Sequence, residues 1–361
     1  MKKQNISGMK IAMVYIGTVV GAGFATGQEI LQFFVHFGLG GFWGILLSVF
    51  LFIFYGYLIM MLGKRFAAKS HREVVIAIGG THGGQALDTL IMLSLFFALT
   101  AMMAGSGALF SQEFAVSPLL GSALMGIVTA VTVLRGLQGV INAISAVVPF
   151  LLIAVIGICL YAIISVSRGT WTIAQTITQQ NFLMQHWFFA ALLYGAYNIL
   201  MSASILAPLG NEASSHRSIF YGAAWGGIGL GAASLLIYFA LGARFSEIYA
   251  LEVPLLYLAA HTSPFAGLLF AFVLLAEIYT TAVSALYGFS ARLGAGKKIT
   301  PKTAVLGATA VAFLASLFGF SSLVRYLYPL QGYGGLLFLA ILLCAVKKIR
   351  RHSNVSLDDQ D

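Results

Sequence analysis

Ten long apolar runs dominate this sequence and decide what it can fold into. An α-helix needs roughly 20 residues to cross the ~30 Å hydrocarbon core of a bilayer, and nearly all of these runs reach that length. Hydrophobic residues make up 60% of the 361 residues and charged residues only 9%, whereas soluble domains carry about 25% charged residues. The sequence therefore predicts an all-α polytopic membrane protein. The expected spans cover residues 8–37, 41–63, 86–113, 117–135, 138–167, 186–209, 217–242, 264–291, 303–318 and 321–346.

The basic residues gather on alternate sides of these spans. If the N-terminus lies in the cytoplasm, 17 of the 20 Lys and Arg residues fall in cytoplasmic segments, and only Arg168, Arg244 and Arg325 fall outside. This asymmetry is the positive-inside pattern of membrane proteins. The net charge of +9 therefore reflects membrane topology, and nucleic acid is not an expected partner. We expect a multi-pass protein of the cell (plasma) membrane with both termini in the cytoplasm.

The connection lengths repeat between the two halves of the chain. The second connection has 22 residues (64–85) and the seventh has 21 (243–263), and both leave room for short interfacial helices, over residues 73–78 and 246–260. Because each half holds five spans, the second half begins on the opposite side of the membrane, which predicts an inverted repeat typical of transporters. The predicted parts are a first five-helix repeat (1–167), an outer connection (168–185), a second inverted repeat (186–347) and a cytoplasmic tail (348–361).

Glycines and polar residues interrupt the first and sixth spans. The run GTVVGAGFATGQE occupies residues 17–29, and the middle of the sixth span holds Gly195 and Asn198, with Pro208 near its inner end. In lipid, backbone groups released from a helix need protein, water or a ligand as partner. Paired interruptions at corresponding positions of two halves predict a solute site between them. The G-x-x-x-G pairs of the first span suit close helix packing equally well.

Two acidic residues fall inside the predicted spans and away from their ends. Glu277 lies near the middle of the eighth span and Glu29 in the outer half of the first. Ionisable side chains are costly in hydrocarbon and usually serve a function there. Thr280 and Thr281 follow Glu277, and their hydroxyl oxygens either ligate a hard cation such as Na⁺ or bond back to their own helix. Glu29 either forms part of an outer gate or makes a hydrated contact between packed helices.

The run at residues 17–29, with FGLGGFW at residues 37–43, resembles the YkvI-type bacterial membrane proteins, relatives of the amino acid/polyamine/organocation (APC) superfamily. The first two spans also resemble the opening of sodium-coupled amino acid transporters with the LeuT fold. This resemblance implies a LeuT-like 5+5 inverted repeat with helices 1 and 6 broken, near residues 21–24 and 195–198. Phe24 stands where the LeuT-type transporters have an asparagine that ligates a second sodium, which argues against a second sodium site of that kind.

The resemblance also implies roles for backbone groups. The N–H groups of Ala22 and Gly23 are expected to face a substrate anion at the start of the outer half-helix. The carbonyl oxygens of Gly17 and Val20 are expected to hold a cation together with hydroxyl groups of the eighth span.

These features predict a secondary active transporter that moves a small solute, such as an amino acid or an amine, with Na⁺ or H⁺ by alternating access. The expected substrate-binding residues are Gly21, Ala22, Gly23, Phe24, Tyr194, Tyr197 and Asn198. Na⁺, as a coupling ion, is the one cofactor that the sequence suggests. Its expected ligands are Gly17, Val20, Glu277, Thr280 and Thr281. The candidates for gating or proton coupling are Glu29 and Glu277.

Two other classes of membrane protein are compared with this prediction, a sensor and an enzyme. A membrane sensor on the same fold is the alternative. An intramembrane enzyme is not expected, because the motifs H-E-x-x-H and G-x-S-x-G do not occur in the sequence.

Overall fold

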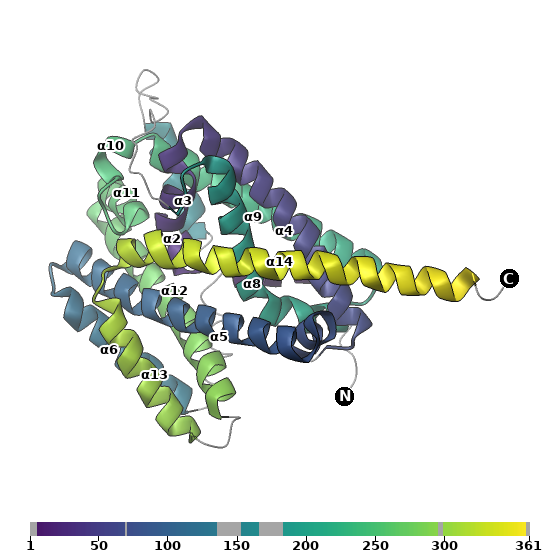
Figure 1. The fold of residues 1–361 in the computed structure, drawn as a ribbon. Coiled ribbons are helices and arrows are strands. Elements are labelled where there is room, and N and C mark those ends of the chain that lie inside the picture. The colour runs from purple at the N-terminus through teal and green to yellow at the C-terminus, as the bar shows by residue number, and fades with distance from the viewer. Residues whose placement is uncertain (1–5, 69–70, 136–152, 166–182, 295–298, 359–361) are drawn as a thin grey trace.

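The computed structural model describes residues 6–68, 71–135, 153–165, 183–294 and 299–358, and these residues form helices almost throughout (Figure 1). The predicted first span holds three short helices and a 3-10 turn, namely α1 (Gly8–Val19), α2 (Ala22–Ala25), α3 (Gln28–Phe33) and η1 (Val35–Phe37). The first half continues with α4 (Leu39–Arg65), α5 (His71–Phe114), α6 (Pro118–Leu134) and the helix Ile153–Ser165. The second half holds α8 (Trp187–Glu212), α9 (His216–Gly242), α10 (Phe245–Ile248), α11 (Pro254–Thr262), α12 (Pro264–Gly294), α13 (Pro301–Ser316) and α14 (Phe320–Asp358).

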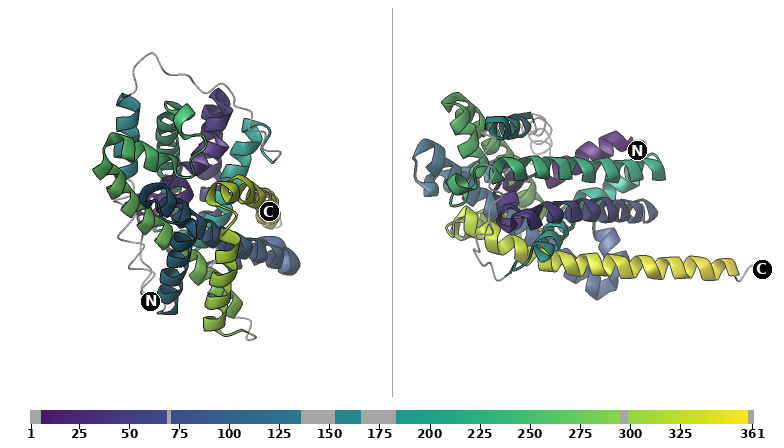
Figure 2. Two further views of the ribbon diagram at one scale, coloured as in Figure 1. Left: turned by 90° about the vertical axis from the view of Figure 1, so that its left-hand side faces the viewer. Right: turned by 90° about the horizontal axis from the view of Figure 1, so that it is seen from above.

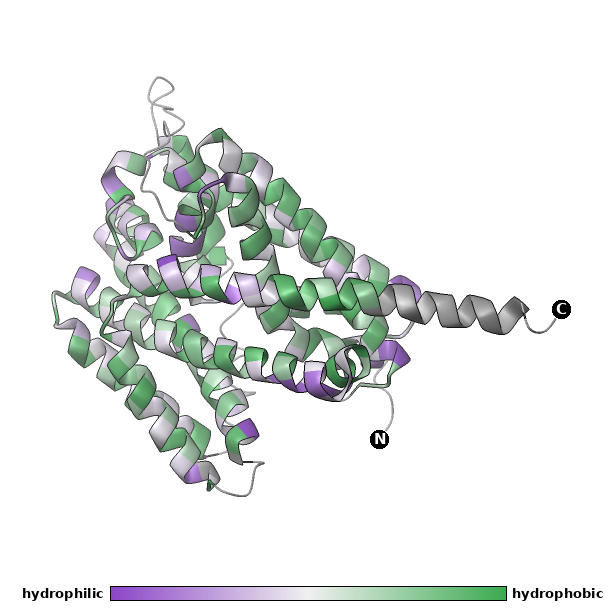
Figure 3. Cartoon of the chain, in the orientation of Figure 1, coloured by the Kyte–Doolittle hydropathy of each residue, from purple (hydrophilic) through white to green (hydrophobic). Residues whose placement is uncertain are grey.

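Six of the described helices are long and apolar enough to cross a bilayer, and four shorter apolar helices accompany them. Each overlaps one of the ten predicted runs, so the helical, multi-pass membrane architecture is confirmed, whereas the count of ten spans stays a prediction. Hydrophobic residues cover most of the helices (Figure 3). Large apolar side chains such as Trp43, Phe50 and Leu314 are exposed, which is expected where the surrounding solvent is lipid.

Local sequence signals fix where several helices begin. The side chains of Ser7, Ser215 and Thr300 each accept a hydrogen bond from the backbone N–H three residues further on, which caps α1, α9 and α13. Proline occupies the first turn of α6, α11 and α13, where its missing N–H costs nothing. These caps and prolines satisfy or remove backbone donors that have no partner within their own helix.

The interrupted first span lies among helices that are distant from it in sequence (Figure 1). Its inner part, α1, packs mainly against α9 and α8, whereas α2 contacts α12 and α5, and α3 contacts α14, α9 and α8. Around this centre, α4 packs on α8 and α9, and α12 packs on α5. The fold therefore brings acidic residues of the first and eighth spans into one interior.

The sixth predicted span is a continuous helix. α8 runs from Trp187 to Glu212 without interruption at residues 195–198, so the predicted break there is wrong. Gly195 instead permits a close contact, because a Cβ atom at this position would lie 2.7 Å from a methyl carbon of Leu51 on α4. The Asn198 amide Nδ2 donates to the carbonyl oxygen of Tyr194 at 3.1 Å and so bonds to its own helix.

The predicted interfacial helices and the tail differ in their limits. Residues 73–78 belong to a helical segment that starts at His71 and ends at a sharp bend at Gly80 (φ 67°). Residues 246–260 form two helices, α10 and α11, because Pro254 starts a new one. α14 continues as a helix to Asp358, beyond the other helices, where a separate tail was expected (Figure 2). The inverted relation of the two halves stays a prediction.

Candidate functional site

The first span is interrupted twice near its middle. α1 ends at Val19, Val20 is extended (φ −70°, ψ 99°), and α2 begins two residues later. A second interruption follows at Gly27, whose left-handed φ of 81° favours glycine. The backbone at Val20 and Gly21 thus leaves the regular helix inside an otherwise apolar interior.

α3 carries Glu29 into this interior, where the residue is only 5% exposed. The Tyr197 hydroxyl of α8 donates a short hydrogen bond to Oε2 of Glu29. The other carboxyl oxygen lies against Gly23, and a Cβ atom at Gly23 would lie 2.8 Å from the carboxyl carbon. Within the described part of the chain, Glu29 forms no ion pair. The chain's own carboxyl group therefore lies at the residue that was expected to face a substrate anion.

Aromatic rings surround this carboxyl group. The Tyr194 ring packs against Phe33, Phe34 and Tyr197, with centroid distances of 5.5, 4.8 and 5.7 Å. Tyr328 of α14 packs on Tyr197 at 5.1 Å. The expected residues Tyr194 and Tyr197 are thus brought together with Glu29.

α14 contributes two residues to this region that sequence reasoning missed. One is Tyr328 on the Tyr197 ring. The other is Gln331, which lies one turn further on the same helix face, is 4% exposed, and has no hydrogen-bond partner for either amide atom among the described residues. Both residues are polar within an apolar span, and Gln331 directly precedes the run GYGG at residues 332–335, so these two signals were available in the sequence.

Glu277 of α12 lies on the other side of the interruption. It is buried, and its Oε2 has no hydrogen-bond partner among the described residues. Thr281 lies one turn further on, on the same face of α12. The Thr281 hydroxyl also approaches the interruption, because a Cβ atom at Gly21 would lie 3.8 Å from its Oγ1. Thr281 therefore lies between the helix turn of Glu277 and the interrupted backbone at Gly21. Carboxyl and hydroxyl oxygens are the type of ligand that a hard cation prefers.

The remaining predicted residues contribute less. Thr280 donates to the carbonyl oxygen of Glu277 (3.0 Å), and Ser284 donates to that of Thr280 (2.8 Å), so both hydroxyl protons are bonded within α12. Phe24 is packed in the core at 1% exposure. Gly17 lies in the last turn of α1, half-buried. The side chain of Ala22 falls outside the described features.

Two hydrogen bonds hold the first span at its second interruption, on either side of Gly27. The Leu255 N–H of α11 donates to the carbonyl oxygen of Thr26 at 3.0 Å, and Nε2 of Gln28 donates to Oγ of Ser321 at 2.9 Å. Burial raises the pKa of Glu252 in the connection before α11, while hydrogen bonds from backbone N–H groups at the start of α14 oppose that rise. α11 and α14 together cover the side of Glu29 that is predicted to face outward.

A second charged cluster joins α5 to α12. Nε of Arg292 donates to Oδ2 of Asp88 at 2.8 Å, and Nη2 makes a second, shorter hydrogen bond to the same oxygen. Nε2 of His71 lies 3.3 Å from the other carboxyl oxygen. This cluster lies at the predicted cytoplasmic ends of the two helices and ties them together.

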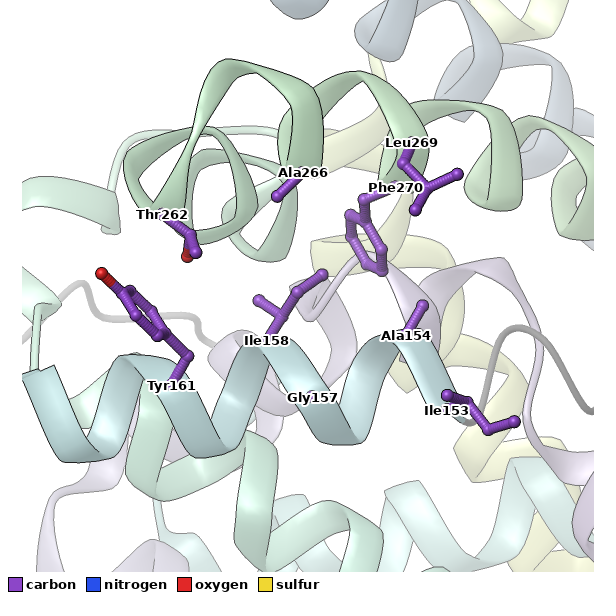
Figure 4. A pocket seen from close by; sticks show the side chains of 9 residues that line it. All are labelled: Ile153, Ala154, Gly157, Ile158, Tyr161, Thr262, Ala266, Leu269 and Phe270. Atoms are coloured by element: carbon purple, nitrogen blue, oxygen red, sulfur yellow. The ribbon is translucent and has the colours of Figure 1, made fainter.

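A pocket of about 240 Å³ lies on the flank of the protein, between the helix Ile153–Ser165 and the ends of α11 and α12 (Figure 4). Tyr161 and Thr262 supply the only hydroxyl groups among its lining residues. No predicted site residue lines it. Its apolar walls and the exposure of Ile153 and Leu269 distinguish it from the polar interior around Glu29 and Glu277.

Two structures of solved transporters share the fold. Mhp1 in an inward-facing conformation superposes with a TM-score of 0.63 at 18% identity, over 95% of this chain and 74% of Mhp1. MhsT in complex with L-phenylalanine superposes with a TM-score of 0.65 at 17% identity, over 96% of this chain and 93% of MhsT. At these identities the likeness establishes the LeuT-type fold and nothing finer.

Two proteins of Bacillus subtilis (strain 168) are related across nearly their whole length. The membrane protein YkvI is 31% identical over 352 residues, which are 97% of this chain and 99% of YkvI. The protein YyaD is 30% identical over 341 residues, which are 93% of this chain and 96% of YyaD. No family model matches the sequence. Since YkvI is 31% identical over 97% of this chain, and the solved neighbours share the LeuT-type fold, the chain belongs to the YkvI family of LeuT-fold membrane proteins.

Proposed function

We propose that this chain is a secondary active transporter of the cell membrane, with both termini in the cytoplasm, that couples a small solute to Na⁺ or H⁺ by alternating access. The solute is an amino acid or an amine, and the lipid bilayer is the protein's other partner. The single observation that carries the proposal is the interrupted backbone at Val20 and Gly21 beside the buried carboxyl group of Glu277. A purely structural helix pair has no use for such an arrangement in hydrocarbon.

The residues present suit a coupling cation. Glu277 has a buried, unpartnered carboxyl oxygen, and Thr281 and the carbonyl groups near Gly21 add oxygens of the type that Na⁺ accepts. In the Na⁺ version of the mechanism, Glu277, Thr281 and the carbonyl oxygens of Gly17 and Val20 hold the ion. In the H⁺ version, the same carboxyl group binds a proton on one side of the membrane and releases it on the other.

The solved neighbours support transport as the activity. Mhp1 is a nucleobase-cation-symport-1 family transporter, and a manganese transporter of Eremococcus coleocola superposes with a TM-score of 0.60. All of these neighbours are transporters of different solutes, so they support the class of function and leave the solute open.

Alternating access follows from how the site is covered. Contacts of Thr26 and Gln28 with α11 and α14 close the predicted outer side. We propose that these contacts separate when the two five-helix repeats, residues 1–167 and 186–347, change their relative orientation. Gly21, Gly23, Tyr194 and Tyr197 then border the solute, and Glu29 belongs to the outer gate.

The test is uptake by proteoliposomes that contain the full chain. Labelled amino acids and their decarboxylated amines are offered while the Na⁺ and pH gradients are set independently. Glu277→Gln keeps the size of the side chain and removes its charge. Ser284→Ala is the matched control on the same helix, because among the described residues the Ser284 hydroxyl bonds only to the carbonyl oxygen of Thr280.

The outcomes separate the mechanisms. Na⁺-driven uptake that Glu277→Gln abolishes and Ser284→Ala preserves supports the Na⁺ site. Proton-driven uptake that loses its pH dependence in Glu277→Gln supports the proton carrier. Solute binding without uptake under any gradient would contradict transport and favour a membrane sensor on the same fold.

A further inference from the structure

We infer that the solute carries a positively charged amino nitrogen and no carboxylate, and that Glu29 provides its counter-charge. This inference rests on the proposed function, because it names the solute class of the same site. It is carried by three features around Glu29: the contact with Gly23, the absence of a basic partner in the described residues, and the aromatic surroundings.

The first feature is the location of the carboxyl group. One oxygen of Glu29 lies against Gly23, with the carboxyl carbon 2.8 Å from where a Cβ atom would be. Glu29 thus fills the space beside the backbone of Gly23, so a solute that approaches this backbone meets the chain's own carboxyl group. A second carboxylate there would meet a like charge in a medium of low dielectric constant, where the repulsion is strong. The site therefore selects against carboxylates.

The second feature is how Glu29 is satisfied. Its one hydrogen bond from a side chain comes from the neutral hydroxyl of Tyr197. Within residues 6–68, 71–135, 153–165, 183–294 and 299–358, no Lys, Arg or His side chain forms an ion pair with it. A carboxyl group in a membrane interior stays ionised only beside a compensating positive charge, and it otherwise takes up a proton. An ammonium group on the solute supplies that charge.

The third feature is the set of aromatic rings. Tyr197, Tyr194 and Tyr328 lie around the carboxyl group in ring-to-ring contact, and cations are attracted to the faces of such rings. The unpartnered amide of Gln331 lies one turn from Tyr328. Rings beside a carboxylate suit an amine with an apolar body, and the amide suits a further polar group on it.

The experiment measures equilibrium binding to the purified full chain in nanodiscs. Each probe set holds an amine, its parent amino acid and the matching carboxylic acid. One set is 2-phenylethylamine, L-phenylalanine and 3-phenylpropionate, and a second is 3-methylbutylamine, L-leucine and 4-methylpentanoate. We expect the amine of each set to bind about tenfold or more tightly than the amino acid, and the carboxylic acid not to bind.

Three variants assign that preference to Glu29. Glu29→Gln keeps the shape and removes the charge, so amine affinity should fall about tenfold or more and the preference over the amino acid should disappear. Glu29→Asp keeps the charge and should keep the preference. Tyr197→Phe removes the hydrogen bond but leaves the charge, so it should also keep the preference. Correct folding of each variant is checked by gel filtration.

The wild-type comparison decides the matter even if a variant does not fold. Amino acids or carboxylic acids that bind as tightly as the amines overturn the inference, and so does the failure of every amine to bind. A preference that survives in Glu29→Gln likewise overturns the role of Glu29. Gradient-driven uptake of amino acids without amine binding would refute this inference and leave transport standing, whereas amine binding without uptake would do the opposite.

Discussion

Replacing Gly23 by alanine tests how closely Glu29 is held against the interrupted helix. The new methyl carbon would lie 2.8 Å from the carboxyl carbon of Glu29 and 2.9 Å from its Cγ, well below the optimal carbon–carbon separation of about 3.5–4.0 Å. Glu29 must therefore move by about 1 Å, and its hydrogen bond with Tyr197 is then lost. A hydrogen bond to a charged group contributes about 1.5–3 kcal/mol, and alanine in α2 returns up to about 1 kcal/mol. We expect a net loss of about 1–2 kcal/mol in the free energy of unfolding.

The assay is equilibrium unfolding in mixed micelles, arranged as a double-mutant cycle with Tyr197→Phe. If both substitutions remove the same hydrogen bond, the double variant should be more stable than the sum of the single effects predicts, by about 1–2 kcal/mol. Gly21→Ala, two residues earlier, is the control, because its Cβ atom would lie 3.8 Å from Thr281 Oγ1, an ordinary contact. Additive losses, or a Gly23→Ala variant as stable as Gly21→Ala, would refute the reasoning.

Three further predictions concern the rest of the molecule. Asp88→Asn should lower the free energy of unfolding by about 1.5–3 kcal/mol. His71→Ala removes a single 3.3 Å contact and should lower it by less than about 1 kcal/mol. Equal losses would contradict the view that Arg292 is the main partner of Asp88. Ser321→Ala removes the acceptor of the hydrogen bond between α3 and α14. Because the Leu255 N–H of α11 donates to Thr26, two residues before Gln28, deuterium uptake in α11 should rise. Unchanged exchange in α11 would argue against a closing role for this contact. A cysteine introduced as His352→Cys in a cysteine-free background should react with an impermeant thiol reagent only from the cytoplasmic side, and reaction from outside would disprove the topology.

The sequence predicts the membrane-spanning architecture well because the signal is long and redundant. An apolar run of about 20 residues has few structural solutions, and alternate basic segments then orient it. The glycine signals are weaker, since a glycine marks either an interruption or a close contact. At Gly195 only the position of Leu51 on a different helix decides for contact, and this information is not in the local sequence.

The candidate site is predictable only in part for the same reason. The placement of Glu29 and Glu277 in apolar spans identifies both as unusual without any structure. Their partners depend on packing between distant segments, as in the contact of Glu29 with Tyr197 across 168 positions. The pairing of Asp88 with Arg292 spans 204 positions, and each residue by itself looks like an ordinary charge at a helix end.

The first span consists of three short helices that are separated at two points, because α2 has only four residues between Val20 and Gly27. No regular helix crosses either Val20 or Gly27, so a change of backbone angle at one of these residues does not have to change the other. α3 is held at its start, where Thr26 and Gln28 form hydrogen bonds with α11 and α14. α1 packs on α9 and is held near its own start, where Ile6 exchanges hydrogen bonds with Glu212 and Ser214 at the end of α8. The two outer pieces of the span can therefore tilt at different times. A solute bound beside α2 would then contact one flanking helix that moves, α1 or α3, while the other keeps its position.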